Sequence, residues 1–144
     1  MNGPPAPLVE ELSRLGYALM RLLLSQAKEV FAREGLSLQQ AEVLRLVKEG
    51  VLLPSRLAEH LEVLPSQVSH LLASLEEAGL LERSPDLEDR RRVHLRLTPK
   101  GEAVQARMQA AWLQVFGQQL SRLNPEEVLL FRDLLRKLTE VGRG

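Results

Sequence analysis

The chain has 144 residues, a length typical of one domain that buries a core without covalent or metal cross-links. It has no cysteine, which excludes disulfides, thiolate nucleophiles, thiol redox sensing and zinc sites built from cysteine. The 19 Lys and Arg residues balance 19 Asp and Glu residues, so the net charge gives no sign of a generally basic nucleic-acid-binding protein.

No apolar run has the length of a membrane span, and the densest, residues 19–24, is interrupted by Arg21. Residues 1–7 have neither the basic start nor the apolar centre of a signal peptide. We therefore expect a cytoplasmic protein with no membrane association.

The first third of the chain predicts two helices. From Leu8 onward, apolar residues recur with the helical period, which predicts one long amphipathic helix that ends near Gly35. Ser37, followed three residues later by Gln40, is a capping box and predicts the start of a second helix. Gly50 is expected to end that helix.

Two short helices are predicted next, over Pro54 to about Leu61 and over Pro65 to Ala78. Each begins with Leu and then Pro, and proline suits the first helical position because the N–H it lacks would have had no partner there. Neither start has the usual Ser, Thr or Asp cap. We expect another group to cap these helices, or their first turns to fray.

A β-hairpin follows these helices. Residues 80–83 begin an extended segment, and residues 84–89 are predicted to form a polar turn. Apolar and polar side chains then alternate strictly, which predicts a strand with one buried face. The alternating residues are Val93, His94, Leu95, Arg96 and Leu97.

Two helices complete the chain. Thr98 and Pro99 start a long one, and Asn124 caps the last one, with Glu127 in the third position. The predicted fold is mainly α with a small β-hairpin wing. A winged helix-turn-helix over residues 36–101 is flanked by dimerisation helices in residues 1–35 and 102–144, all within one compact domain.

The helix that starts at Pro65 has one face suited to a DNA major groove. Its apolar side chains lie on the other face, and no residue from Val63 to Leu75 is charged. Short hydrogen-bonding groups without carboxylates suit base edges and do not repel phosphates. The candidate DNA-contacting residues are Ser66, Gln67, Ser69 and His70, with Ser74 one turn further on. An ordinary solvated, serine-rich face is the alternative.

The hairpin carries a group of cations. Five of them lie in residues 90–100, a segment with no acidic residue: Arg90, Arg91, Arg92, Arg96 and Lys100. Guanidinium groups at a loop tip suit phosphates and a narrow minor groove. The alternative is a solvated turn whose arginines pair with Asp86, Glu88 and Asp89. We expect Asp89 to brace Arg91 while Arg90 and Arg92 point outward.

Segments 75–83 and 89–101 resemble the signature of the MarR (multiple antibiotic resistance regulator) family. The pattern is Asp89, any residue and Arg91, then an alternating strand that closes in Leu97, Thr98, two residues and Gly101. The resemblance implies an obligate dimer, an operator-binding recognition helix and an arginine-bearing wing. It also implies repression that is often relieved by a small phenolic or lipophilic anion.

By position, Ser66, Gln67, Ser69 and His70 match the groove-contacting helix of that family, and Arg91 matches its wing-tip arginine. The chain departs from the family pattern at three places. Leu64 stands where the family often has a capping Ser or Thr. Arg92 and His94 replace residues that are commonly apolar or small, which adds positive charge to the wing.

The flanking helices predict a homodimer. All five aromatic residues lie outside residues 36–101: Tyr17, Phe31, Trp112, Phe116 and Phe131. The apolar stripes of the flanking helices have no partner within the winged helix, so we expect the same helices of a second copy of the chain to cover them. Two recognition helices would then lie about one DNA turn apart, roughly 34–36 Å, which predicts a pseudopalindromic operator on double-stranded DNA.

A candidate effector pocket lies between the flanking helices. Its predicted lining is Tyr17, Met20, Arg21, Trp112 and Phe116. Arg21 would attract an anionic group on a small molecule. The alternative is that these residues form dimer core and that Arg21 is solvated.

Other functions have less support from the sequence. His60, His70 and His94 fall on three different predicted elements, and no nucleophile motif or phosphate loop is present, so we expect no enzyme, metal site or cofactor. A metal sensor would have to rely on those histidines and scattered Glu. An architectural or protein-interaction winged helix without operator specificity is the stronger alternative.

The zero net charge is a sum of unlike regions. Residues 51–89 contain 2 cations and 8 anions, whereas residues 90–100 contain 5 cations and no anion. Local placement of charge, with weak non-specific affinity for DNA, is therefore expected in place of a general basic field.

Overall fold

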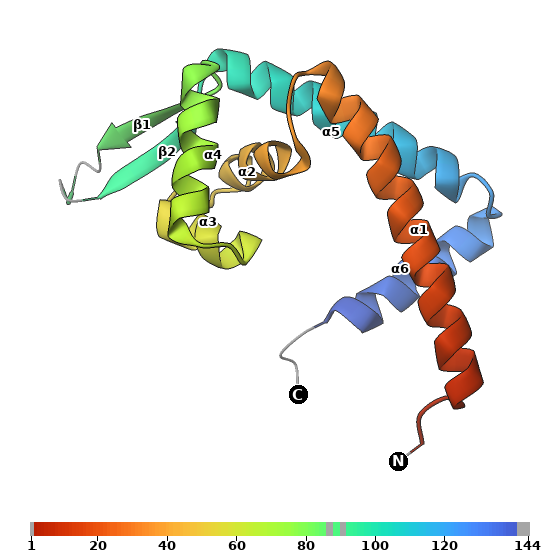
Figure 1. Cartoon of the computed structure of the whole chain (residues 1–144). Helices are drawn as coiled ribbons and strands as arrows, with labels where there is room; N and C mark the ends of the chain where they lie inside the picture. Colours follow the sequence, from red (N-terminus) through yellow and green to blue (C-terminus); the bar gives the residue numbers. More distant parts are fainter. Residues whose placement is uncertain (1, 86–87, 90–91, 141–144) are drawn as a thin grey trace.

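The computed structural model describes residues 2–85, 88–89 and 92–140. Within these residues six helices and a two-stranded antiparallel sheet follow the predicted order (Figure 1). The helices are α1 (Ala6–Arg33), α2 (Leu38–Lys48), α3 (Pro54–Leu61), α4 (Pro65–Glu77), α5 (Pro99–Leu120) and α6 (Pro125–Thr139). The strands are β1 (Leu81–Pro85) and β2 (Val93–Leu97).

Helices α2, α5 and α6 start at side-chain caps, as the sequence predicts. In α2 the Gln40 N–H donates to Ser37 Oγ at 3.1 Å, and the Ser37 N–H donates to Gln40 Oε1 at 2.9 Å. Asn124 and Glu127 form the same reciprocal pair at the start of α6. Each pair satisfies N–H groups that a helix start otherwise leaves without partners.

Helix α4 starts differently, because Leu64 at its N-cap has no side-chain acceptor. The Leu64 N–H donates instead to Gln67 Oε1 at 3.0 Å, which is half of a capping box. This bond satisfies the N–H of Leu64, while no side chain caps the first N–H groups of α4 itself. Helix α3 has no side-chain cap.

The hairpin is longer on its first strand than predicted. Strand β1 continues through Pro85, so Ser84 pairs with His94 and Pro85 pairs with Val93, and the prediction that the turn begins at Ser84 was wrong. Pro85 is tolerated because it occupies the last pair of a two-stranded ribbon, where a missing N–H costs little. Val93, at that outer pair, is exposed, whereas Leu95 and Leu97 are buried as predicted.

The core lies inside the winged helix. Five fully buried leucines fill it, and they come from α2, α3, α4 and β2: Leu44, Leu57, Leu72, Leu75 and Leu95. Burying each leucine stabilises the fold by roughly 2 kcal/mol relative to leaving it exposed. The Leu95 N–H also donates to Leu52 O at 2.8 Å, which joins the second strand to the segment before α3.

The flanking helices leave much of their apolar surface uncovered within one chain. Helix α5 packs on α1, α2 and β2, but α6 contains no buried residue, and α1 is exposed from its start through Leu22. Figure 1 shows the hairpin and α4 on one side of the molecule and helices α1 and α6 on the other.

Candidate DNA-binding surface

The face of α4 that the sequence singled out is exposed. Ser66, Gln67, Ser69 and His70 are all solvent-accessible, whereas Val68 between them is 1% exposed. This division follows the helical period, because positions one, three and four residues apart fall on one side while the apolar stripe faces the core. The first two turns of α4 therefore present hydroxyl, amide and imidazole groups without a carboxylate.

Ser74 is placed differently from the other four candidate residues. It is half-buried, its Oγ accepts a hydrogen bond from Gln40 Nε2 at 2.9 Å, and its hydroxyl donates to Leu71 O at 2.8 Å. Gln40 thus caps α2 with its oxygen and contacts α4 with its nitrogen. The hydroxyl of Ser74 joins two helices of the DNA-binding module, which sequence periodicity alone did not indicate.

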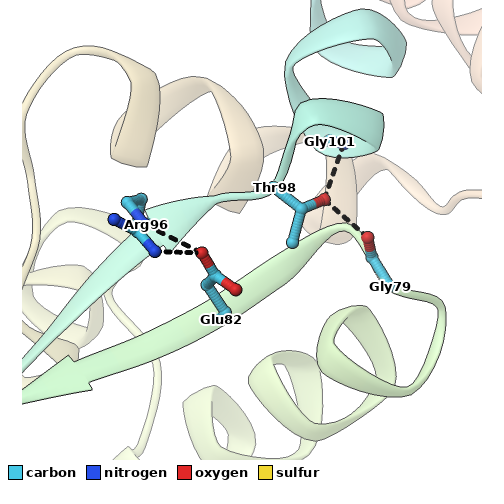
Figure 2. A network of polar contacts seen from close by, with 5 residues as sticks. All are labelled: Gly79, Glu82, Arg96, Thr98 and Gly101. Carbon is cyan, nitrogen blue, oxygen red and sulfur yellow. Dashed lines mark hydrogen bonds and ion pairs between the residues drawn. The ribbon is translucent and has the colours of Figure 1, made fainter.

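Some cations of the wing form hydrogen bonds within the protein. Arg96 donates to Glu82 Oε1 on the opposite strand, at 2.8 Å from Nε and 2.5 Å from Nη2 (Figure 2). The Lys100 Nζ donates to Ala78 O at 3.0 Å, at the carboxyl end of α4. Arg96 and Lys100 therefore have partners within the fold, and those partners lie outside residues 90–100, the acid-free segment in which the sequence places both cations.

The tip of the wing is described in part. Arg92 is exposed; its N–H donates to Asp89 O at 3.0 Å, and its Nε lies 4.0 Å from Asp89 Oδ2. Arg90 and Arg91 lie outside the described residues, so the expected contact of Asp89 with Arg91 stays a prediction. Asp89 contacts Arg92, although the sequence predicts that Arg92 points outward.

A joint connects the recognition helix to α5. The Thr98 hydroxyl donates to Gly79 O at 2.6 Å and accepts from the Gly101 N–H at 3.0 Å, as Figure 2 shows. The Thr98 N–H donates to Leu80 O at 3.1 Å. These bonds hold the start of α5 against the turn that follows α4, so both helices have a defined mutual orientation.

Gly101 is required at this joint for steric reasons. A Cβ atom on Gly101 would lie 1.9 Å from Leu80 O, far inside contact distance. Only glycine lets the first turn of α5 approach the backbone before β1 so closely. The Thr98 to Gly101 pattern seen in the sequence is thus a packing requirement of the joint.

Glu62 is a feature that sequence reasoning missed. It is the C-cap of α3 and has φ +55° and ψ +46°, the left-handed region. This conformation turns the chain from α3 into α4 within three residues. Glycine or asparagine is the usual signal for such a position, and neither is present here.

An ion pair links the carboxyl end of α1 to α5. Arg107 Nη2 donates to Glu34 Oε1 at 2.7 Å, and Arg107 Nε lies 3.1 Å from both carboxylate oxygens. These hydrogen bonds lower the pKa of Glu34 and raise the pKa of Arg107. On α2, hydrogen bonding to Glu42 likewise raises the pKa of Arg45, which also contacts Glu49.

A cavity of about 230 Å³ lies between α1, α2 and α5. Its walls are mainly apolar, and its polar groups come from α2 and α5. The lining includes Leu24, Phe31, Ala41, Arg45, Met108 and Trp112. Of the five predicted pocket residues, only Trp112 lies in this wall.

The other predicted pocket residues form separate contacts. The Arg21 guanidinium lies 5.9 Å from the ring centroid of Tyr17 on the exposed side of α1. Trp112 and Phe116 meet edge to face at 5.8 Å, but Phe116 lines a different cavity, with Leu19 and Phe131. Met20 is about half exposed. A single chain therefore does not bring the five residues into one pocket.

The three histidines lie on α3, α4 and β2, and within the described residues no three metal-ligating side chains converge. None of the helices in the described part of the chain is long and apolar enough to cross a membrane.

Comparison with known proteins agrees with this arrangement. The family described as winged helix DNA-binding domain matches residues 36–101. The HTH-type transcriptional repressor MdtR of Bacillus subtilis is 32% identical over 126 residues, which cover 87% of this chain and 81% of MdtR. The HTH-type transcriptional regulator FarR of Neisseria gonorrhoeae is 30% identical, over 83% of this chain and 82% of FarR.

Solved structures show the same fold over almost the whole chain. A MarR family protein from Bacillus stearothermophilus is 25% identical, with a TM-score of 0.86, over 94% of this chain and 96% of that protein. The YusO protein of Bacillus subtilis is 26% identical, with a TM-score of 0.75, over 97% and 100% of the two chains. The chain belongs to the MarR family of winged helix-turn-helix proteins, and it is a DNA-binding transcriptional regulator and not an enzyme.

Proposed function

We propose that this regulator is a homodimeric repressor that binds a pseudopalindromic operator. Helix α4 enters the major groove with Ser66, Gln67, Ser69 and His70, and the wing arginines Arg90, Arg91 and Arg92 contact phosphates or the minor groove. Ser74, with its two internal partners, would support α4 in addition to any DNA contact. A relative named as a transcriptional repressor, MdtR, supports the direction of regulation.

The observation that carries the proposal is the character of the exposed α4 face. Four polar, uncharged side chains stand on a helix whose opposite side is fixed by fully buried Leu72 and Leu75. A rigid helix with short hydrogen-bonding groups loses little entropy when it contacts base edges. The structure of a mutant MarR from Escherichia coli complexed with operator DNA shares the fold at a TM-score of 0.73 and 21% identity.

The proposed dimer is supported by the uncovered apolar side chains of the flanking helices. Leu12 and Leu15 on α1 are 56% and 60% exposed, and Leu138 on α6 is 81% exposed. Apolar surface of this extent on a single chain favours burial against a second copy, in which two α4 helices bind successive major grooves.

The proposed effector is a small aromatic molecule that binds in the cavity beside Trp112. Because Arg45 in the cavity wall is already paired with Glu42 and Glu49, an uncharged aromatic is favoured over an anion. A thermal-shift comparison of salicylate with salicylamide, which has the same shape without the charge, tests this preference. Stabilisation by salicylate alone would favour an anionic effector instead.

Selection of bound duplexes from a random DNA pool tests the function itself. A homodimeric regulator should enrich a two-fold symmetric site with half-sites roughly one helical turn apart. Its affinity should fall steeply with salt, with a slope set by the number of phosphate contacts. Equal affinity for random and selected duplexes would refute operator recognition and leave an architectural winged helix as the function.

A further inference from the structure

Leu64, at the N-cap of α4, is unusual in its surroundings. It exposes 67% of its surface, and among the described residues of the winged helix only Leu64 and Val93 are exposed large apolar side chains. The other exposed large apolar residues lie on α1, α5 and α6 or on the turn between α5 and α6. Leu64 is thus an exposed apolar residue directly before the first turn of α4, the turn that carries Ser66 and Gln67.

The backbone of Leu64 is held on both sides. Its N–H donates to Gln67 Oε1 at 3.0 Å, and its carbonyl oxygen accepts from the N–H groups of Gln67 at 3.0 Å and Val68 at 3.2 Å. Pro65, the next residue, has its φ restricted by its ring. The exposed Leu64 side chain therefore extends from a fixed backbone and loses little backbone freedom on contact with a ligand.

The same hydrogen bond orients the amide of Gln67. Because the Leu64 group is an N–H donor, the amide oxygen must face it, and the Gln67 NH₂ group points away from it. The paired recognition of adenine by glutamine needs both the oxygen and the nitrogen on the base. In this arrangement the nitrogen is the part of Gln67 that is offered to DNA, so Gln67 acts as a donor.

An apolar side chain at Leu64 and a hydrogen-bond donor at Gln67 Nε2 together match one base. In the major groove thymine presents a C5 methyl group and the O4 acceptor, whereas cytosine presents an amino donor and guanine has no methyl group. We infer that the start of α4 reads thymine, with Leu64 packed on the methyl group and Gln67 Nε2 donating to O4. This inference rests on the proposed operator binding and names a base that the operator contains.

Deoxyuridine substitution tests the contact of Leu64, because uracil differs from thymine only by the methyl group. In the site obtained from pool selection, each thymine is replaced by deoxyuridine symmetrically in both half-sites, and Kd is measured by fluorescence anisotropy. The wild-type protein should lose about fourfold in affinity per half-site at one position, the effect of removing one buried methyl contact. Leu64→Ala should bind the thymine and uracil duplexes equally at that position and respond like wild type elsewhere.

A second variant tests Gln67 separately. Gln67→Glu keeps an oxygen to accept from the Leu64 N–H but replaces the outward donor with an acceptor. It should shift the preference at the same position from thymine towards cytosine, whose amino group is a donor. Circular dichroism of each variant shows that it is folded, which is expected because both side chains are exposed.

The outcomes separate this inference from the function on which it depends. If pool selection enriches no site, operator recognition fails and the inference fails with it. If a site is enriched but deoxyuridine costs wild type and Leu64→Ala the same at every position, the regulator stands and the thymine contact is refuted. Unchanged base preference in Gln67→Glu would refute the donor role of Gln67.

Discussion

Glu62 has the only positive φ among the described non-glycine residues, and it sets the angle between α3 and α4. A side chain in the left-handed region costs about 1–2 kcal/mol, whereas glycine adopts it freely at an entropic cost of about 0.5–1 kcal/mol in the unfolded chain. Glu62→Gly should therefore raise the free energy of unfolding by roughly 0.5–1 kcal/mol in urea denaturation.

Glu62→Gln is the matched control, since it keeps the backbone strain and removes the charge. Its stability should stay close to that of the parent. If Glu62→Gly is no more stable than Glu62→Gln, the left-handed turn is not strained. Both variants should bind operator DNA slightly more tightly, because an exposed carboxylate at the turn before α4 repels phosphate.

The Glu34 to Arg107 pair predicts a pH dependence. The folded-state pKa of Glu34 is lowered, so its contribution to stability is fully present above the unfolded pKa, near 4.5, and is lost as the pH falls through the folded pKa. The difference in unfolding free energy between wild type and Glu34→Gln should thus be largest near neutral pH and close on acidification towards pH ~3.

The same comparison in an Arg107→Gln background is the control. Without the guanidinium, replacing Glu34 should have little pH-dependent effect, because the hydrogen bond that lowers its pKa is gone. A pH-dependent difference of the same size in that background would assign it to another partner. Salt should weaken the effect, since Arg107 is largely exposed.

Arg91 and Gln67 separate affinity from specificity. Arg91 lies outside the described residues, and Arg91→Ala should weaken binding to all sequences and reduce the salt slope, as expected of a phosphate contact.

Gln67→Ala should instead relax the preference for one base pair, by about 1–3 kcal/mol. Quantitative binding to single-substitution operator variants at several salt concentrations distinguishes them. Identical specificity profiles for Gln67→Ala and the parent would show that Gln67 does not read a base.

At the scale of elements, the joint between the start of β1 and α5 determines how the DNA-binding module is attached to the flanking helices. Thr98 and Gly101, at the start of α5, contact the backbone of Gly79 and Leu80 after the recognition helix. At this joint the backbone of α5 lies directly against the backbone of Gly79 and Leu80, so neither segment can shift without displacing the other. A change in the direction of α5 would therefore be transmitted to α4 through these contacts.

Two glycines of α5 provide a matched test of this joint. Gly117→Ala, with no atom within 4 Å of the new Cβ, should stabilise the protein by about 0.5–1 kcal/mol through helix propensity. Gly101→Ala should instead destabilise it, because its Cβ would meet Leu80 O at 1.9 Å. Thermal unfolding of the two variants should give shifts of opposite sign. Equal shifts in unfolding temperature would mean that the backbone at Leu80 moves to accommodate the new Cβ at little cost in stability.

At the scale of the whole molecule, the uncovered stripes of α1 and α6 predict that dimerisation and DNA binding are lost together. Leu12→Glu should convert the protein to a monomer in sedimentation and lower operator affinity more than tenfold, because a charge would be buried in the apolar interface. Arg14→Glu is the control, since Arg14 lies about 200° around the helix from Leu12. It should remain dimeric, and a monomeric Arg14→Glu would show that the interface is elsewhere.

The positive and negative charges of the chain are distributed unevenly along it, although they sum to zero. The net charge is zero, yet α4 has no charged residue before Glu76, and the segment at residues 90–100 has only cations. Among the described wing cations, Arg96 contacts Glu82, Lys100 contacts Ala78 O and Arg92 contacts Asp89, while the side chains of Arg92 and Arg96 stay more than half exposed. Binding should thus depend on a few local contacts.

Local patterns in the sequence predicted the helices, their caps and the polar face of α4. Ser37 with Gln40 and Asn124 with Glu127 act over three residues, and helical periodicity places Val68 inside and Ser69 outside, so the sequence alone determines them. The strand limit at Pro85 was missed because pairing with Val93 depends on the opposite strand.

Contacts between distant segments were decided only by the tertiary structure. Ser74 meets Gln40, 34 residues away, Lys100 reaches Ala78, and Trp112 turns into a cavity that Tyr17 does not line. Periodicity indicates on which face of a helix a residue lies, but it does not indicate which atoms of a distant segment pack against that residue. The sequence by itself determined a winged helix, the uncharged polar face of α4 and the apolar flanking helices. Packing decided which polar groups are engaged within the protein, as Ser74 is, and which stay exposed on the first turns of α4.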